Sequence, residues 1–452
     1  MIDQFAARAE AEPEIVAHHL TEAGSIEPAI EWWSKAAEQS GRRTALVEAI
    51  AHRQKAVTLA DTSTGPSANG IRRLRLQVAL ASALMVMKGY VAPETVNAFM
   101  RARDFADGVG DCTERQTLYY GLWLTAITRG EIKPAREAAE MLLRAVEHRP
   151  QSSEMADAYL AYGLTRFFEG HFKEARAYQE RAYALGDVAT SGPALTYNHW
   201  TVAVIGCFAY PLSALGEFEL AHRVIEQAIK RAEAAQNIAT NVYVQALALR
   251  IVGWYAPVAH IQHLAKMASK AGEHGIHLAI ATVRFFDNWA RWRSGDRNIA
   301  IHEMHSAVAV FRGELWTVYP TATVLLAEVE AAVGHVDAAL RSLDELLVEV
   351  DRSGHHWFDA EIYRQRGELL LRNRNDTRKS AADFERALQI ARKQEGKLFE
   401  LRAAVSLARL WRDQHKRAEA RDLLAPIYSW FSSGFDMPDL VAAKALLNEL
   451  SS

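Results

Sequence analysis

A spacing rule recurs along the chain and constrains its fold more than any other feature. A Gly ends an amphipathic segment, an Ala follows five residues later, and a small or aliphatic residue stands seven positions after that Ala. Seven residues are about two turns of an α-helix, so both positions lie on one helix face. Six glycines obey the rule: Gly24 (Ala29, Ala36), Gly130 (Ala135, Leu142), Gly170 (Ala175, Ala182), Gly216 (Ala221, Ala228), Gly295 (Ala300, Ala307) and Gly334 (Ala339, Leu346).

The unit behind the rule is clearest in residues 153–185, which read SEMADAYLAYGLTRFFEGHFKEARAYQERAYAL. Two short amphipathic helices are expected here, hinged at Gly170. Small residues at Gly163, Ala175 and Ala182 let the two helix backbones approach closely. Since the turn glycines recur at a period of roughly 40 residues, the sequence predicts helix pairs that stack into a solenoid.

This pattern resembles the tetratricopeptide repeat, in which a small residue, a turn Gly and two alanines mark each helix pair. The resemblance implies an all-α, right-handed α-α superhelix, and the helices along the chain indicate about ten pairs with a C-terminal capping helix. We expect a long connection at 186–198 that bends the stack, and a longer loop within one pair at 373–380, NRNDTRKS. Four segments are predicted: 1–60 (junction-like N-terminal repeats), 71–185 and 194–351 (tetratricopeptide-like repeats), and 357–452 (C-terminal repeats and cap).

Composition excludes several classes of protein. Among 452 residues, 50% are hydrophobic and 24% charged, which is typical of a folded chain and not of a disordered one. A net charge of −3 gives no general attraction to nucleic acid or anionic lipid, so neither is expected as a partner. The two cysteines are too few for a disulfide framework, and the N-terminus lacks a signal peptide, which predicts a cytoplasmic protein.

One stretch without Asp, Glu, Lys or Arg runs from Val188 to Gly216. Its continuous apolar part, Val202 to Tyr210, is too short to cross a bilayer. We therefore expect a buried repeat helix here and no membrane segment.

Two longer blocks carry a more specific resemblance. Residues 85–111 and 384–450 are similar to the C-terminal repeat arm of bacterial regulators in which a class III adenylate/guanylate cyclase domain and a P-loop ATPase module precede that arm. Residues 12–36 resemble the join between the ATPase module and the arm. The resemblance covers nearly the whole chain, but only as the arm, and it implies a cyclase/ATPase module as a partner in cis or in trans.

The catalytic parts of those regulators have no counterpart in this sequence. No G-x-x-x-x-G-K-[ST] motif occurs, because Gly396 and Lys397 are followed by Leu398 and lack the upstream Gly. Paired metal-binding aspartates of the cyclase type are missing too. No catalytic residue, cofactor or metal site is therefore expected.

One histidine pair invites a metal interpretation. His302 and His305 stand three residues apart in H-E-M-H, whereas the zinc helix H-E-x-x-H separates its histidines by four positions. Met304 and Ala307 occupy repeat-core positions. A solvated helix face is therefore the better interpretation.

The candidate binding site follows from the geometry of the resembling family. In those solenoids the first helix of each pair lines the concave face, and ligand peptides lie there. Aromatic residues and Arg, which anchor interfaces, occur at fixed distances before the turn glycines, although packing against the next repeat is the alternative role. The predicted groove residues are Tyr120, Leu124, Leu164, Phe168, Tyr210, Phe285, Trp289, Trp292 and Arg293.

The strongest groove candidates are Trp289, Trp292 and Arg293, because two tryptophans one turn apart beside several arginines are unusual in a core. The sequence thus predicts a non-catalytic scaffold or sensor arm that binds a protein or peptide on its concave face. It would relay that binding to a signalling module. The alternative is the regulatory C-terminal part of an adenylate/guanylate cyclase with an ATPase module.

Overall fold

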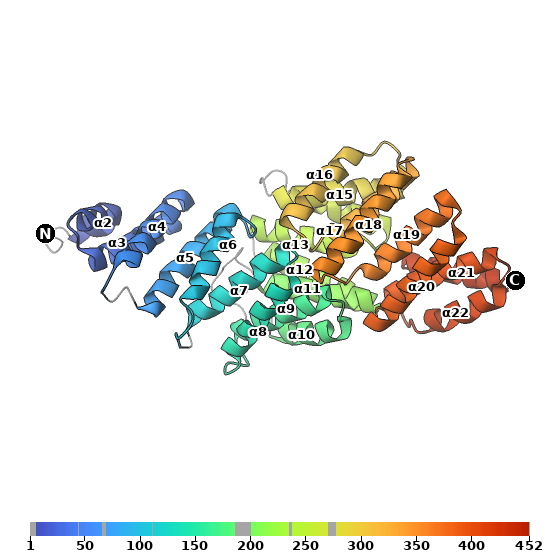
Figure 1. Ribbon diagram of the computed structural model, residues 1–452, viewed down its shortest axis with the longest axis horizontal. Coiled ribbons are helices and arrows are strands. Elements are labelled where there is room, and N and C mark those ends of the chain that lie inside the picture. Colours follow the sequence, from blue (N-terminus) through green and yellow to red (C-terminus); the bar gives the residue numbers. More distant parts are fainter. Residues whose placement is uncertain are drawn as a thin grey trace. The chain divides into compact units, whose positions relative to one another are not determined.

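The computed structural model describes residues 6–43, 45–65, 69–110, 112–185, 200–234, 237–269 and 277–451. Within these ranges the elements are 23 α-helices and no strands (Figure 1). None of these helices combines the length and apolar character needed to span a bilayer. The connection expected at 186–198 lies outside the described residues, as does the start of the uncharged stretch; its remainder forms a helix over Trp200–Leu215.

Contacts between Cα atoms divide the chain into two compact units. The first unit comprises Met1–Thr125 and Glu137–His148, and the second comprises Ala126–Arg136 and Arg149–Ser452. The four segments expected from the sequence stay a prediction about how the repeats are grouped.

The first eight helices lie in the first unit or pass between the two. They are α1 (Ala6–Ala11), α2 (Pro13–Glu22), α3 (Ile26–Arg42), α4 (Leu46–Thr62), α5 (Gly70–Lys88), α6 (Pro93–Asp104), α7 (Thr113–Thr128) and α8 (Ile132–Val146).

The remaining helices belong to the second unit. They are α9 (Ser153–Phe168), α10 (Phe172–Ala184), α11 (Trp200–Leu215), α12 (Phe218–Ala234), α13 (Ile238–Val252), α14 (Val258–Ala268), α15 (His277–Arg293), α16 (Ile301–Glu314), α17 (Tyr319–Ala332), α18 (Val336–Ser353), α19 (Asp359–Arg374), α20 (Thr377–Gln394), α21 (Lys397–Asp413), α22 (Arg417–Ser429) and α23 (Pro438–Ser451).

Taken in chain order, the described helices group into ten pairs of consecutive helices, in agreement with the expectation of about ten. The pairs are α2/α3, α5/α6, α7/α8, α9/α10, α11/α12, α13/α14, α15/α16, α17/α18, α19/α20 and α21/α22. The last helix, α23, packs against α21 and α22, as expected of a cap.

The spacing rule is confirmed at the level of the backbone. All six turn glycines have positive φ, from 68° at Gly24 to 99° at Gly334, a conformation that a side chain disfavours. The Ala or Leu residues after them are at most 3% exposed, with one exception at Ala300. A Cβ added at Gly163 would lie 3.0 Å from the Cβ of Tyr178, which confirms the close approach of α9 and α10.

Ala300 departs from the rule because α16 begins one residue after it. The residues after Gly295 stay non-helical: the Asp296 carboxylate accepts the Asn298 N–H at 2.8 Å, and the Asn288 Oδ1 accepts the Ala300 N–H at 2.8 Å. Ala300 is therefore the half-buried N-cap of the helix and not a core residue.

The longer loop expected at 373–380 is wrong. Helix α19 continues to Arg374 and α20 starts at Thr377, so the turn is only two residues long. Asn375 takes the left-handed conformation at φ 51°, and the Asp376 side chain accepts the Lys379 N–H at 3.0 Å. These polar residues cap the end of one helix and the start of the next. Helix caps and loops use the same residue types, so the two are hard to distinguish in a sequence.

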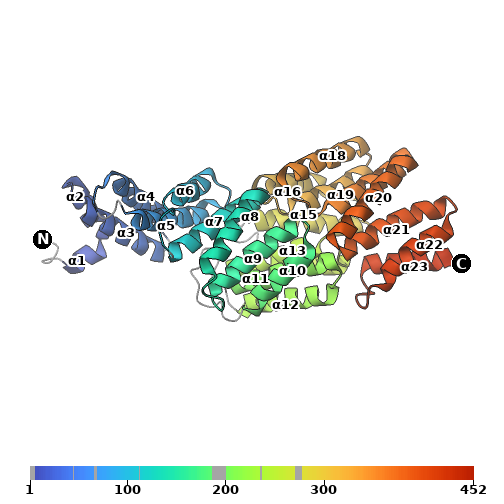
Figure 2. The ribbon, with the colours of Figure 1, turned by 60° about the horizontal axis from the view of Figure 1, so that its bottom comes forward.

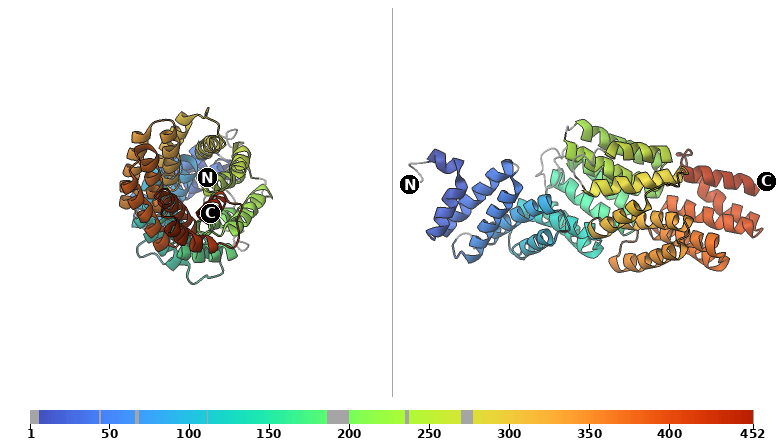
Figure 3. Two further views of the ribbon diagram at one scale, coloured as in Figure 1. Left: turned by 90° about the vertical axis from the view of Figure 1, so that its right-hand side faces the viewer. Right: turned by 90° about the horizontal axis from the view of Figure 1, so that it is seen from above.

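Within the second unit, the first helices of successive pairs lie side by side. Figure 2 shows α9, α11 and α13 next to one another, and the same succession of contacts continues through α15, α17, α19 and α21. Seen end-on, the helices run round an axis from teal through green and yellow to orange (Figure 3, left). Helix α21 packs on α11, so the path of the chain returns to its own earlier turn.

The contacts between the earlier and the later turn satisfy carbonyl groups at the ends of helices. Such carbonyls have no partner within their own helix. The Trp316 N–H donates to the Thr128 carbonyl at 2.9 Å, and the Trp357 N–H donates to the Phe168 carbonyl at 3.1 Å. We call this line of contacts the seam. Its earlier side consists of Thr128–Gly130, Phe167–Gly170, Gly216–Phe218 and Trp254. Its later side consists of Trp316, His355–Phe358, Gln394–Arg402 and Phe431.

Aromatic side chains fill the seam. Trp357 is 1% exposed, and its ring lies 5.0 Å from that of Phe167 and 5.8 Å from that of Trp254 (centroid distances). Phe399 stacks on Trp254 at 5.4 Å. The earlier and later turns of the second unit are therefore joined by a continuous apolar contact.

Candidate functional site

The nine predicted groove residues fall into three levels of burial. Tyr120, Leu164, Phe168, Tyr210, Phe285 and Trp289 are buried; Leu124 and Trp292 are half-buried; Arg293 is exposed. Most of these side chains thus contact other parts of the chain, and their role in binding stays a prediction.

The seam accounts for two of the buried aromatics. Phe168 stacks on His355 at 4.7 Å, and the Tyr210 ring lies 5.2 Å from that of Phe167. Burial raises the pKa of Tyr210, so its hydroxyl stays neutral. Phe168 stands two positions before Gly170, at the helix end, where the seam forms.

Helix α15 uses its aromatics differently. Phe285 packs on Phe311 of α16 with ring centroids 6.0 Å apart, and the Trp289 indole donates to the Gly253 carbonyl at 3.1 Å. Trp292 stacks on Trp289 at 5.3 Å and is half-buried. Its indole N–H is buried and has no acceptor among the described residues. Trp289 thus holds α15 in place, whereas Trp292 keeps an unused donor.

Charged side chains from consecutive first helices gather beside this end of α15. Glu328 on α17 interacts electrostatically with Arg293 on α15 and with Glu361, Arg364 and Arg372 on α19. We call these residues, together with Glu368, Arg402 and Asp439, the inner charge cluster.

Most members of the cluster are paired. Arg364 donates to both carboxylate oxygens of Glu361, at 2.9 and 2.7 Å, and Arg402 bridges Glu361 at 3.2 Å and Asp439 at 2.9 Å. Although burial alone would raise the pKa of Glu361, the Arg364 and Arg402 guanidinium groups lower it below its ordinary value. Arg372 approaches Glu368 to 3.1 Å.

Arg402 also links the cluster to the seam, since its guanidinium donates to the Trp254 carbonyl at 3.0 Å across 148 residues.

Glu328 is the unpaired acid of the cluster. It is half-buried, and in the described part of the chain its carboxylate has neither a hydrogen bond nor an ion pair within bonding distance. Burial raises its pKa, while the more distant Arg293, Arg364 and Arg372 oppose that rise. This carboxylate is an acceptor that the fold itself does not use.

Sequence reasoning missed Glu328, although a signal for it exists. It stands six residues before Gly334, the offset that also selected Leu164, Tyr210 and Trp289 before their turn glycines. Because the sequence criterion favoured aromatic residues and Arg, it did not select the acidic Glu328. The ion pair between Arg402 and Glu361 could not be read from spacing, because it joins separate helix pairs.

One histidine of the pair on α16, His305, has an acidic partner. His305 lies 3.1 Å from the Glu330 carboxylate, and both line a pocket of about 480 Å³ between α16, α17 and α18. Met304 and Ala307 are buried, which confirms their core positions. Over the described ranges, no group of three or more His, Cys, Asp or Glu side chains is arranged to hold a metal ion.

No family model matches the sequence, and no curated protein matches it. Solved structures do. The Rap protein complexed with competence and sporulation factor is 14% identical, aligns over 83% of this chain and 99% of its own, and gives a TM-score of 0.53. The fold is a tetratricopeptide-like helical solenoid.

Two further structures align with lower scores. The apo form of the quorum sensor NprR from B. thuringiensis is 11% identical over 79% of this chain and 98% of its own, with a TM-score of 0.47. The human IFIT1 dimer with m7Gppp-AAAA is 13% identical over 89% and 90%, with a TM-score of 0.45.

Proposed function

We propose that the second unit is a non-catalytic scaffold that binds a peptide segment of a partner protein along α15, α17 and α19. The observation that carries the proposal is the half-buried, unpaired carboxylate of Glu328, in a cluster where Glu361, Arg364 and Arg402 are paired with one another. Partial burial raises the pKa of the Glu328 carboxyl, and a hydrogen-bond donor or cation on a ligand would favour its charged form.

A polypeptide has the groups that this surface lacks. Its backbone N–H groups or a basic side chain satisfy Glu328, a carbonyl accepts the free indole N–H of Trp292, and an acidic side chain meets Arg293, which is exposed. Of the predicted groove residues, Trp292 and Arg293 are therefore the ones proposed to contact the ligand directly. The buried ones, such as Phe285 and Trp289, support the helices.

The proposal names a polypeptide and not a nucleic acid. The inner charge cluster contains as many acidic as basic side chains, whereas a phosphate backbone is bound by an excess of Lys and Arg. The Rap protein, solved with competence and sporulation factor, is an example of a related solenoid that holds a ligand.

The test is a selection of random phage-displayed peptides on the full chain, followed by measurement of their affinities by fluorescence anisotropy. We expect the double variant Glu328→Gln/Arg293→Gln to weaken selected peptides by about tenfold or more, since charged hydrogen bonds at the centre of an interface dominate its affinity. Circular dichroism checks that the variant keeps its helicity.

The matched control is Arg284→Gln, an exposed arginine on the same helix α15. It should leave the affinities unchanged. Peptides that bind the double variant as tightly as the wild type would contradict the proposed site.

A second proposal concerns signalling. We infer from the resemblance of residues 85–111 and 384–450 that the chain serves as the regulatory arm of a bacterial, cytoplasmic adenylate/guanylate cyclase with an ATPase module, in cis or in trans. Ligand binding across several repeats would change their curvature and bias the attached module. Limited proteolysis with and without a selected peptide tests the relay, and an identical cleavage pattern would count against it.

A further inference from the structure

The row of first helices in the second unit carries a half-buried arginine that the fold leaves largely unused. Arg250 stands near the end of α13, one turn after Ala246 and Leu247. Ala246 packs on Ala279 of α15, and a Cβ added at Gly206 of α11 would lie 2.9 Å from the Leu247 side chain. Because Arg250 follows Ala246 by four residues and Leu247 by three, it lies on the strip of α13 between the two neighbouring first helices.

The Arg250 side chain is oriented by its own helix. Its Nε donates to the Ala246 carbonyl at 3.1 Å, and its guanidinium lies over the ring of Tyr243, 5.9 Å from the centroid. Tyr243 stands seven residues earlier, about two turns, on the same face. These contacts use one of the five N–H groups of the guanidinium. Within the described residues, Nη1 and Nη2 of Arg250 have no acceptor and no carboxylate forms an ion pair with it.

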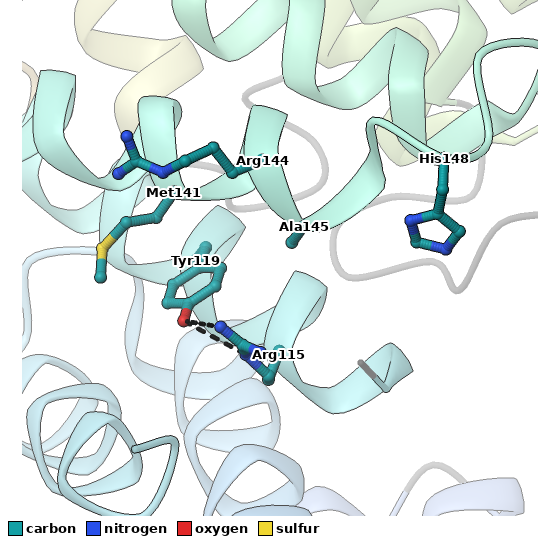
Figure 4. Close-up of a pocket in the computed structure, with 6 residues that line it drawn as sticks. All are labelled: Arg115, Tyr119, Met141, Arg144, Ala145 and His148. Atoms are coloured by element: carbon teal, nitrogen blue, oxygen red, sulfur yellow. Dashed lines mark hydrogen bonds between the residues drawn. The ribbon is translucent and has the colours of Figure 1, made fainter. Parts of the chain in front are cut away.

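Other half-buried arginines find acceptors within the fold. Arg115 in the first unit donates from Nε and Nη2 to the Tyr119 hydroxyl oxygen, at 3.3 and 3.0 Å (Figure 4), and from Nη1 to the Val109 carbonyl at 3.1 Å. Arg364 in the inner charge cluster has an ion pair. Arg250 differs from both, since its charge and most of its donors are available to a ligand.

The side chains around Arg250 do not compensate its charge. The guanidinium acts electrostatically on Cys207 and Tyr210 of α11 and on Tyr243. Burial raises the pKa of the Cys207 thiol to about 12 and also raises the pKa values of the two tyrosines, so all three groups are neutral at neutral pH. A cation among buried neutral groups favours an anionic partner.

We propose that Arg250 binds an acidic side chain of the peptide that the second unit holds along α15, α17 and α19. This inference rests on the proposed function and extends its site by one first helix, since α13 packs on α15. A carboxylate and a guanidinium form two parallel N–H···O bonds, for which the two free Nη groups suffice.

The extension fixes an order of charges in the ligand. Along the row of first helices the open charges are positive at Arg250 on α13, positive at Arg293 on α15 and negative at Glu328 on α17. The matching peptide segment therefore carries two acidic side chains on one side of a basic one.

The experiment uses peptides selected on the full chain by phage display, with affinities measured by fluorescence anisotropy. Each Asp or Glu of a peptide is replaced in turn by Asn or Gln and measured against the wild type and against Arg250→Gln. One replacement should weaken binding to the wild type about tenfold but change binding to Arg250→Gln less than about twofold, because its partner is already gone. The acid coupled in this way to Arg250 should differ from the one coupled to Arg293 in the same cycle with Arg293→Gln.

Two further variants serve as controls. Arg250→Lys keeps the charge but not the paired donors, so it should weaken the peptides less than Arg250→Gln does. Arg223→Gln changes an exposed arginine on α12, outside the row of first helices, and should leave the affinities unchanged. Circular dichroism checks that every variant keeps its helicity.

The outcomes separate this inference from the proposed function. Peptides that Glu328→Gln/Arg293→Gln weakens, but whose acidic residues show no coupling to Arg250, would overturn the inference and leave the proposed function intact. Equal weakening by Arg223→Gln, or a single acid coupled to both Arg250 and Arg293, would also overturn it. Failure to select any peptide, or equal binding to all variants, would overturn both.

Discussion

The turn glycines of the second unit stand in two different environments, although one spacing rule selects them all. A Cβ added at Gly130 would lie 2.6 Å from the Trp316 ring, and one at Gly216 would lie 2.6 Å from Phe431. At Gly295 and Gly334 no atom lies within 4 Å of the added Cβ. The first group needs Gly both for positive φ and for the close approach of the seam, whereas the second group needs it for φ alone.

This comparison separates the local from the long-range role of one residue type. The turn itself requires only a backbone conformation, and Asn375 and His415 provide it without Gly in the last two pairs. The seam adds a steric requirement that arises from segments far away in sequence.

The largest expected effect comes from removing the centre of the seam. Trp357→Ala should destabilise the protein by about 4 kcal/mol, because a fully buried aromatic leaves a cavity that its neighbours cannot fill. Urea unfolding followed by circular dichroism measures it. Trp430→Ala, at a side chain that is 49% exposed, is the control and should cost less than about 1 kcal/mol. Equal losses would mean that the seam contributes little.

The glycine comparison itself can be tested by two matched substitutions in the same unit. Gly216→Ala should cost about 3 kcal/mol, since the left-handed backbone costs 1–2 kcal/mol and overpacking against Phe431 adds a similar amount. Gly295→Ala should cost only about 1 kcal/mol, from φ alone. Thermal and urea unfolding compare them, and equal destabilisation would remove the distinction between the two groups.

The seam should also respond to acid through His355. This side chain is fully buried between Phe168 and Trp316, and neither ring nitrogen has a partner among the described residues. Burial lowers the pKa of His355 from 6.5 to about 3. The unfolded chain therefore binds the proton more readily, and stability falls as the pH drops from 6.5 toward 3.

At pH 5 this linkage should amount to about 2 kcal/mol relative to pH 7, since each pKa unit corresponds to 1.36 kcal/mol. Urea unfolding between pH 7 and pH 4 measures it, with His355→Phe as the comparison. The variant should lose that part of the pH dependence. Parallel curves for the two proteins would show that His355 does not titrate on unfolding.

The smallest effect is expected from an ion pair at the same edge. Lys173 on α10 pairs with Glu395 at the end of α20, and both side chains are largely exposed. A double-mutant cycle with Lys173→Ala and Glu395→Ala should give a coupling of about 0.5 kcal/mol or less, further reduced by salt. A coupling well above that value would indicate that ionic contacts hold the seam as strongly as aromatic ones.

Much of the fold follows from local sequence. Positions such as Ala175 and Leu346 identify helix pairs because their burial depends only on the neighbouring helix, within the same repeat. A long loop was wrongly predicted at the NRNDTRKS segment, because Asn375 and Asp376 cap helices there. Helix caps and loops use the same residue types.

The seam and the inner charge cluster could not be derived in this way. Phe168 satisfies every local criterion for an inward-facing aromatic, and only the position of His355 and Trp357 decides that it packs inside the chain. Arg402 likewise has the sequence context of an ordinary surface arginine, since its partner Glu361 belongs to one helix pair and Arg402 to the next.

The bond from Arg402 to the Trp254 carbonyl, across 148 residues, has a consequence for the order of assembly. An ordinary solenoid grows from neighbour to neighbour, so each repeat is complete soon after the ribosome releases it. In this chain the early repeats are completed only by later ones. Until residues 355–402 have been synthesised, the side chains of Phe168 and Trp254 remain exposed to water. We expect the nascent chain to expose an aggregation-prone aromatic surface during that interval. A fragment ending at Ser353 should therefore aggregate under conditions in which the full chain does not.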